Sequence, residues 1–163
     1  HSERRHVFGE PDDLIAKKLI SALQAELIPI LCVGETLAER EASQTTGVVS
    51  RQLGAAIRDV RDAALLRKVT IAYEPVWAIG TGKTATPQQG QEVQQFLRDQ
   101  LRSAFRALGA PEAAADDTRI LYGGSVKPEN AAELLAEPDI DGLLVGGASL
   151  KADSFLKICA AGA

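Results

Sequence analysis

One stretch of the sequence, AYEPVWAIGTGKT over residues 72–84, joins an apolar segment to a loop that contains two glycines. The apolar run Val69–Tyr73 predicts a strand buried on both faces, and the strand ends at Glu74 because Pro75 cannot donate the next ladder hydrogen bond. A carboxylate is therefore expected at the C-terminal end of a strand. Gly80 and Gly82 lie mid-loop between stiffer residues, which is typical of a loop that moves as one piece. An ordinary glycine-containing connection is the alternative interpretation.

The same alternation of an apolar segment, a turn and an amphipathic segment extends over the rest of the chain. The predicted strands are Leu27–Val33, Val69–Tyr73, Arg119–Tyr122 and Asp141–Val145. The predicted helices are 12–23 with an aspartate cap, 48–66, 87 to near 109, 127–136 and 152–160, with a helical turn at 35–41. The clearest helix start is Thr86-Pro87-Gln88-Gln89, which offers a cap, a proline at the first position and a glutamine at the third. We expect His1–Phe8 to be a loop and Ala110–Thr118 a surface linker.

Four strand-then-helix units in succession predict a parallel sheet covered by helices. Each predicted strand is apolar on both faces, and each is followed at its C-terminal end by a turn rich in glycine or proline. Two α/β architectures fit this pattern, an open doubly wound sheet and an arc of a barrel.

The composition narrows the class of protein. A length of 163 residues suits one domain, and 45% hydrophobic with 25% charged residues is typical of soluble globular proteins. The net charge of -4 argues weakly against nonspecific nucleic-acid binding, and no apolar run approaches a membrane helix. Cys32 and Cys159 form neither a metal-like spacing nor a disulfide framework, so we expect a cytoplasmic protein. Because the chain contains no Met and begins at His1, we expect a processed product or part of something longer.

Two glycine pairs indicate an anion site. Gly123-Gly124-Ser125 and Gly146-Gly147 each lie between a strand and a helix, where backbone amides can converge on a phosphate. Tight turns alone are the competing interpretation for either pair. A Walker loop is excluded, because the required first glycine would stand at Trp77, and no GxGxxG motif occurs. We interpret Cys32 as core and His6 as a surface or packing histidine, and we expect no metal site.

Five motifs closely resemble the triosephosphate isomerase family. They are AYEPVWAIGTGKTA at 72–85, HSERR at 1–5, CVGE at 32–35, YGGSV at 122–126 and DGLLVGGASL at 141–150. The resemblance covers the chain in order and implies a (β/α)8 barrel. Here it implies an incomplete arc of about four parallel strands with flanking helices, a single domain over residues 1–163. The implied reaction interconverts dihydroxyacetone phosphate and D-glyceraldehyde 3-phosphate through an enediolate, in glycolysis and gluconeogenesis, without a cofactor.

The resemblance also implies a role for individual residues. It assigns Glu74 as catalytic base, His1 as the electrophile that polarises the substrate oxygens, and Glu3 as a second carboxylate that assists. It assigns the substrate phosphate to Gly80, Ser125, Gly146 and Gly147. The implied mobile lid consists of Pro75, Val76, Trp77, Ala78, Ile79, Gly80, Thr81, Gly82, Lys83, Thr84 and Ala85. Tyr122 and Ser125 resemble the residues that hold this lid shut, and Glu35 resembles the partner of the hinge residue Trp77.

One departure from the family pattern is large. The region that would supply the first strands of the barrel is not in the sequence, which leaves an arc with two open edges that should pair or aggregate. The implied partners are a phosphorylated triose and, in the complete protein, a second subunit, with no nucleic acid and no membrane. Two alternatives stay open. One is a catalytically incompetent partial barrel that self-associates or docks the missing half, and the other is a different phosphate-binding barrel that uses another acid.

Overall fold

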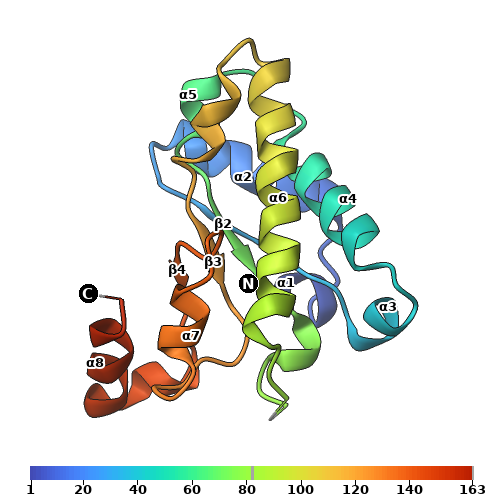
Figure 1. Ribbon diagram of the computed structural model, residues 1–163. Helices are drawn as coiled ribbons and strands as arrows, with labels where there is room; N and C mark the ends of the chain where they lie inside the picture. The colour runs from blue at the N-terminus through green and yellow to red at the C-terminus, as the bar shows by residue number, and fades with distance from the viewer. Residues whose placement is uncertain (82, 163) are drawn as a thin grey trace.

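Four parallel strands form a single sheet whose spatial order follows the chain (Figure 1). The computed structural model describes residues 1–81 and 83–162. The strands are β1 Ile30–Val33, β2 Thr70–Tyr73, β3 Ile120–Tyr122 and β4 Gly142–Leu143. A doubly wound sheet reverses its strand order at a switch point, whereas a barrel adds each strand next to the previous one. The order β1-β2-β3-β4 therefore selects the arc of a barrel, as the sequence pattern allowed.

The register gives the sheet two different faces. Leu31, Val33, Ile71 and Tyr73 belong to the apolar core shared with the helices. The alternate row aligns Cys32 with Ala72, then Leu121, then Gly142, and side chains in this row point to the opposite, inner face of the arc. Glu74 continues the inner row beyond the end of β2.

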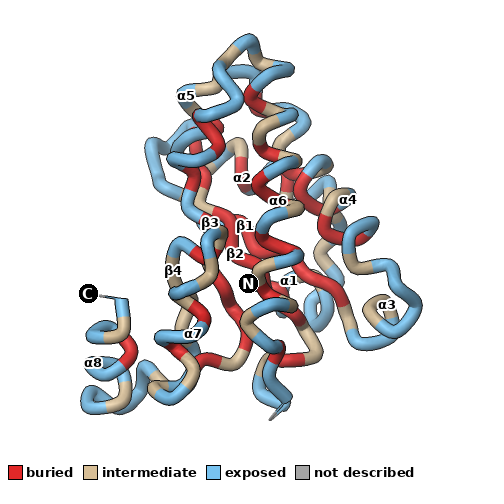
Figure 2. Tube along the Cα trace, in the orientation of Figure 1, coloured by how far each residue is buried: buried red, intermediate tan, exposed pale blue. Residues whose placement is uncertain are grey.

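Three long helices cover the outer face of the sheet. They are α2 Asp12–Gln24, α4 Thr45–Ile57 and α6 Pro87–Ala107, with α4 packed between the other two. Figure 2 shows the buried strands and the buried stripe of α6 in one continuous core. The buried positions of α6 recur every three or four residues, at Gly90, Val93, Gln94, Leu97, Arg98, Leu101 and Phe105. This amphipathic spacing explains why α6 packs along its whole length.

The start of α6 confirms the predicted cap. The Thr86 hydroxyl accepts from the Gln89 amide at 3.1 Å, and the Gln89 side chain accepts from the Thr86 amide at 3.0 Å. Pro87 occupies the first helical position. Gly109 follows the helix with φ +72°, a left-handed conformation that favours glycine and ends the helix where the sequence predicts.

Several predicted boundaries were wrong. Residues 3–6 form a short helix, α1 Glu3–His6, within the predicted loop. The predicted helix 48–66 is two helices, because α4 ends at Ile57 and the Asp62 side chain caps a new start, α5 Ala63–Leu66. α2 is preceded by Pro11 without a side-chain cap, and Asp12 instead pairs with Arg5 and Arg51.

Several of the remaining elements are shorter than predicted, whereas α8 spans Ala152–Ala160 as the sequence predicts. α7 spans Ala131–Leu135 instead of starting at Lys127, since Asn130 accepts from the Lys127 amide at 2.8 Å and holds those residues in a turn. β1 starts at Ile30, after Pro29, and β4 has two residues. The other elements are α3 Leu37–Glu41, α8 Ala152–Ala160 and the 3-10 turns Val76–Ala78, Glu112–Ala115 and Gly147–Leu150.

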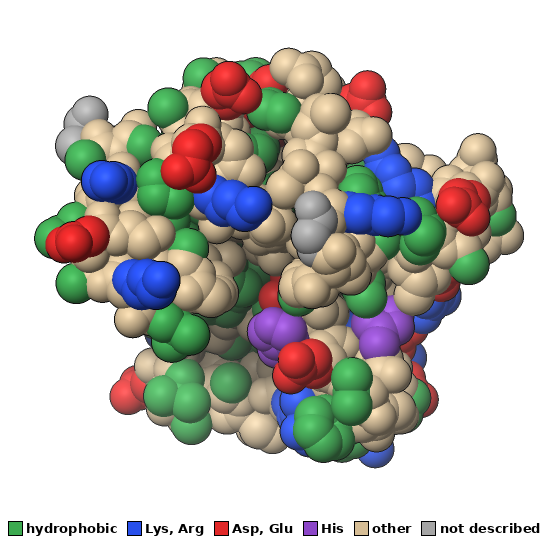
Figure 3. All heavy atoms as spheres, turned by 90° about the horizontal axis from the view of Figure 1, so that it is seen from below, with side chains coloured by type: hydrophobic (Ala, Val, Ile, Leu, Met, Phe, Trp, Pro, Cys, Tyr) green, Lys and Arg blue, Asp and Glu red, His purple; other side chains and the backbone are tan. Residues whose placement is uncertain are grey.

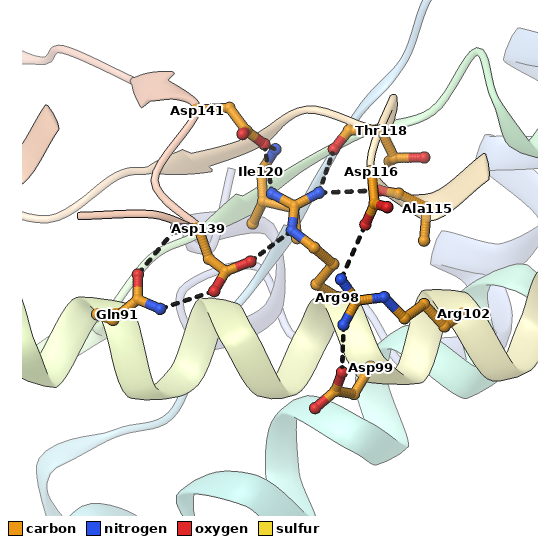
Figure 4. A network of polar contacts seen from close by, with 10 residues as sticks. All are labelled: Gln91, Arg98, Asp99, Arg102, Ala115, Asp116, Thr118, Ile120, Asp139 and Asp141. Carbon is orange, nitrogen blue, oxygen red and sulfur yellow. Dashed lines mark hydrogen bonds and ion pairs between the residues drawn. The ribbon is translucent and has the colours of Figure 1, made fainter. Parts of the chain in front are cut away.

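A buried arginine explains why residues 110–118 are not a plain surface linker. Arg98 of α6 is 4% exposed and donates to the carbonyls of Ala115 and Thr118 at 2.8 and 3.1 Å (Figure 4). The same guanidinium pairs with Asp139 at 2.6 Å and Asp141 at 2.7 Å. Arg98 thus fastens both the entry to β3 and the entry to β4 onto α6, with Ala114, Ala115 and Thr118 buried beneath it.

Candidate functional site

A cleft opens at the C-terminal end of the strands. It has a volume of about 610 Å³ and is lined by the turns that follow β2, β3 and β4, together with the N-terminal segment. The same end of the molecule is hollowed in the space-filling view, with a histidine at the rim (Figure 3). The structure brings seven of the predicted site residues to this cleft, namely His1, Glu74, Ile79, Gly80, Ser125, Gly146 and Gly147.

Glu74 places a buried carboxylate in the cleft. The residue is 1% exposed, and its Oε2 accepts from the Ser2 amide at 2.6 Å. A Cβ on Gly123 would lie 2.8 Å from Glu74 Cγ, so the glycine leaves the room that the carboxylate arm occupies. Burial, and secondly the charge of Glu74, raise the pKa of the Cys32 thiol to about 11. The carboxylate is thus held in a place from which water is largely excluded.

His1 faces the same carboxylate. Its Nε2 lies 3.5 Å from Glu74 Oε1, and its Nδ1 accepts from the Glu3 amide at 3.1 Å. A neutral imidazole that accepts at Nδ1 carries its proton at Nε2, so the ring presents an N–H donor beside the base. The Glu3 carboxylate is 64% exposed, and its Oε2 lies 3.9 Å from His1 Nδ1. Glu3 therefore approaches the site mainly through its backbone amide.

Glu35 anchors the start of the predicted lid. Its fully buried carboxylate accepts from Trp77 Nε1 at 2.9 Å and from the Tyr73 hydroxyl at 3.1 Å. The predicted pairing of Trp77 with Glu35 is therefore present. Ala78, the last residue of the first turn of the lid, is buried, and Gly82 lies outside the described residues.

Arg40 is a neighbour of this anchor that the sequence reasoning missed. It pairs with Glu35 at 3.1 Å and places its guanidinium 4.9 Å from the centre of the Trp77 ring. The charges at Glu35–Glu41 predict a solvated helical turn, and nothing in their spacing shows that Arg40 turns toward Glu35 and Trp77. The charge of Arg40 neutralises the buried Glu35 carboxylate, which accepts the hydrogen bond from Trp77.

The two glycine pairs differ in whether a Cβ would fit at their positions. A Cβ on Gly124 would meet the Tyr122 hydroxyl at 2.2 Å, so close packing against neighbouring side chains accounts for Gly123-Gly124. A Cβ on Gly146 or Gly147 would meet nothing within 4 Å. Packing within the chain therefore does not require glycine at 146 and 147, whereas close approach of a ligand to the backbone would. Lys127 and Lys151, which the sequence reasoning did not single out, also line the cleft and add positive charge.

Comparison with known proteins shows to which family this chain belongs. The sequence model of the family described as triosephosphate isomerase matches residues 1–162. The chain belongs to the triosephosphate isomerase family. The resemblance of its five motifs is thereby confirmed, and the open four-stranded sheet is part of a TIM barrel.

Individual members of the family agree over almost the whole chain. A triosephosphate isomerase from Herminiimonas arsenicoxydans is 58% identical over 159 residues, which cover 97% of this chain and 61% of that protein. Those from Paracidovorax citrulli and Thiobacillus denitrificans are each 56% identical over 163 residues, covering 61% and 63% of their own lengths. The chain thus spans about three fifths of the length of these relatives.

Tyr122, the residue that resembles the lid latch of the family, is buried next to the end of the lid. Burial raises the pKa of its hydroxyl to about 12, against a smaller lowering by the backbone amide of Ala85. The hydroxyl forms no hydrogen bond with any residue in the described ranges, so the Ala85 amide is near but not bonded. The second proposed latch, Ser125, accepts at its carbonyl from Asn130 Nδ2 at 3.1 Å.

Two further observations apply to residues 1–81 and 83–162. None of the helices in these ranges has the length and apolar character needed to cross a bilayer. Within the same ranges, no group of three or more His, Cys, Asp or Glu side chains is arranged to hold a metal ion.

Proposed function

We propose that this chain carries the catalytic machinery of a triose-phosphate isomerase, which interconverts dihydroxyacetone phosphate and D-glyceraldehyde 3-phosphate. The observation that carries the proposal is the buried Glu74 carboxylate, 3.5 Å from His1 Nε2 in a cleft with open backbone at Gly146 and Gly147. A base, an N–H donor and a phosphate cradle in one cleft are the parts that isomerisation of a phosphorylated triose requires.

In the proposed reaction, Glu74 removes a proton from the carbon next to the substrate carbonyl and returns it to the neighbouring carbon. His1 Nε2–H donates to the oxygen on which negative charge develops, and an enediolate forms. The imidazole passes its proton to that oxygen and takes the hydroxyl proton of the neighbouring oxygen in exchange, so that the carbonyl moves to the neighbouring carbon and the isomer forms. Glu3 assists by fixing the imidazole through its amide, which bonds to His1 Nδ1 at 3.1 Å. The proposed reaction needs no cofactor, because each step is a proton transfer between a side chain and the substrate.

The substrate phosphate is proposed to lie on the backbone amides of Gly80, Gly146 and Gly147 and beside Ser125. Lys127 and Lys151 line the same cleft and would raise the local concentration of the dianionic substrate. The lid that begins at Pro75 and ends at Ala85 is proposed to close over the substrate and exclude water. Tyr122 and Ser125 would hold its closed position. Closure would protect the enediolate intermediate from side reactions.

The proposal concerns a complete barrel, meaning this chain together with the strand–helix units that its relatives contain and it does not span. The outer edges of β1 and β4 are the places where such units would pair. A homodimer of complete barrels, a role in glycolysis and gluconeogenesis and a cytoplasmic location form part of the same proposal. The free thiols of Cys32 and Cys159 support the location, since the cytoplasm keeps thiols reduced.

Glu74→Gln in the complete barrel tests the assignment. The substitution removes the base and keeps the size of the side chain, so we expect kcat to fall by roughly 10²–10⁴-fold. Binding of inorganic phosphate and the far-UV circular dichroism spectrum should stay unchanged. The matched control is Glu92→Gln, at an exposed position on α6, which should keep full activity. Near-complete activity of Glu74→Gln would exclude Glu74 as the base.

The second candidate function is a non-catalytic partial barrel that associates with itself or with the missing half. The open edges of the four-stranded sheet favour this hypothesis. Light scattering and an isomerase assay on the isolated chain distinguish the two. A stable assembly without activity supports the partial barrel, and a monomer that turns over substrate rejects it.

A further inference from the structure

Gly34 is the point at which the ends of β1 and β2 touch. The Val33 carbonyl accepts from the Glu74 amide at 2.8 Å, and the Glu35 carbonyl accepts from the Val76 amide at 3.1 Å. Gly34 lies between these two bonds, so close to the next strand that a Cβ on it would be 1.8 Å from the Glu74 carbonyl oxygen. Any movement of the Gly34 backbone is therefore transmitted to the backbone of Glu74.

Both polar groups of the Gly34 backbone are taken by a single side chain. Gln52, which extends from α4 and is 2% exposed, accepts from the Gly34 amide through Oε1 at 2.8 Å. Its Nε2 donates to the Gly34 carbonyl at 3.1 Å. The side-chain amide thus bonds to Gly34 as a neighbouring strand would. Without it, a buried N–H and a buried C=O would lose their partners, which proteins rarely tolerate.

We propose that Gln52 is a positioning residue that holds Glu74 and Glu35 in register by clamping Gly34. Glu74 is fixed through the close backbone contact, and Glu35 is fixed because it follows Gly34 directly. Glu35 in turn holds the lid through Trp77, at 2.9 Å. One side chain on the outer helix layer therefore sets both the proposed base and the anchor of the proposed lid. This inference rests on the proposed isomerase function for its kinetic consequence.

Gln94 provides a matched control in the same molecule. It is also a glutamine on a long outer helix, α6, and it is fully buried. Neither of its amide atoms has a hydrogen-bond partner among the described residues, whereas both of those of Gln52 do. Replacing each glutamine by methionine keeps the volume and removes the amide. The two variants therefore differ in whether a clamp on Gly34 is lost.

The experiment compares Gln52→Met and Gln94→Met in the complete barrel. For Gln52→Met we expect kcat to fall about 10- to 100-fold, because small displacements of a catalytic group have effects of this size, while KM changes less than about threefold. By NMR, amide exchange at Gly34 should accelerate and the indole N–H resonance of Trp77 should shift. Gln94→Met should leave kcat, Gly34 exchange and the Trp77 resonance as in the parent protein. A purely structural role for Gln52 would lower stability without moving kcat or the indole resonance.

The inference is overturned if Gln52→Met keeps the parental kcat and Trp77 resonance, or if Gln94→Met lowers kcat equally. If the parent protein does not isomerise the triose phosphates, the proposed function fails, yet Gly34 exchange and the Trp77 resonance still decide whether the clamp exists. Should Gln52→Met fail to fold, Gln52→Glu keeps the side-chain length and the acceptor for the Gly34 amide but removes the donor to the Gly34 carbonyl. A parental kcat and indole resonance in Gln52→Glu would then overturn the two-bond clamp, and a loss of kcat with a shifted resonance would support it.

Discussion

At the scale of single residues, the pKa of the Cys32 thiol reflects how little water reaches the inner face of the sheet beside Glu74. Burial first, and the Glu74 charge second, raise the pKa of the thiol from 9.0 to about 11. A raised native pKa means that the folded chain holds this proton more tightly than the unfolded chain. The contribution of this thiol to the free energy of unfolding is therefore present below about pH 9 and is lost as the pH rises toward 11. We expect the free energy of unfolding to fall by about 1 kcal/mol between pH 8 and pH 10 from this group.

Cys32→Ala should remove that part of the alkaline loss, as measured by urea unfolding at the two pH values. Cys159→Ala, at an exposed thiol on α8, is the control and should keep the full loss. If Cys32→Ala loses as much stability as the parent, the loss belongs to other groups. The buried hydroxyls of Tyr73 and Tyr122, whose pKa values burial also raises, would then be responsible.

Residues of the site were predictable where chain position alone decides their surroundings. The strand that ends before Glu74 and Pro75 places Glu74 in the cleft, and the motif at residues 1–5 indicates His1. Gln52 and Arg40 were not predictable, because each turns inward toward a segment that the fold brings near. A polar residue in an amphipathic helix looks solvent-facing in sequence, and only the packed structure shows that Gln52 bonds to Gly34.

At the scale of secondary-structure elements, the attachment of α6 to the loops depends on Arg98. Arg98→Leu would leave Asp139 and Asp141 without their cation and the Thr118 carbonyl without the Arg98 donor, whereas the Ala115 carbonyl would keep its bond from the Thr118 amide. We expect a loss of about 3–5 kcal/mol in the free energy of unfolding, measured by urea denaturation, because removing one partner strands buried charge.

Arg102→Leu, one turn further along α6, is the control for this prediction. Arg102 is 36% exposed and pairs with Asp99 and Asp116, which are both more than half exposed (Figure 4). Such pairs contribute about 0–1 kcal/mol. Equal losses of unfolding free energy in Arg98→Leu and Arg102→Leu would show that burial does not increase the contribution of Arg98 to stability.

The elements themselves were predicted best where the signal is local. The start of α6 follows from Thr86, Pro87 and Gln89, which interact only with one another and with the helix they begin. The break at Asp62 and the late start of α7 after Asn130 were missed, because a side chain there competes with the helix for backbone groups. Amphipathic spacing continues across such breaks and so cannot reveal them.

At the scale of the whole molecule, the open edge of β1 should govern how the isolated chain associates. Ile28 and Ile30 are 74% and 48% exposed there. Lysine on an edge strand opposes pairing with another strand. We therefore expect the double variant Ile28→Lys, Ile30→Lys to shift the isolated chain toward monomer in sedimentation velocity. Leu156→Lys, at a 64% exposed position on α8, should leave the distribution unchanged. Equal association of the double variant and the parent would show that this edge is not used.

The strand order also bears on how the chain acquires its structure. Each of the three pairings, β1 with β2, β2 with β3 and β3 with β4, joins strands that are consecutive in the chain. Because no pairing skips a strand, β1 and β2 have all they need to associate before β3 is synthesised. A ribosome would release the parts of this sheet in the order in which they pair. Folding could then keep pace with translation, one strand–helix unit at a time.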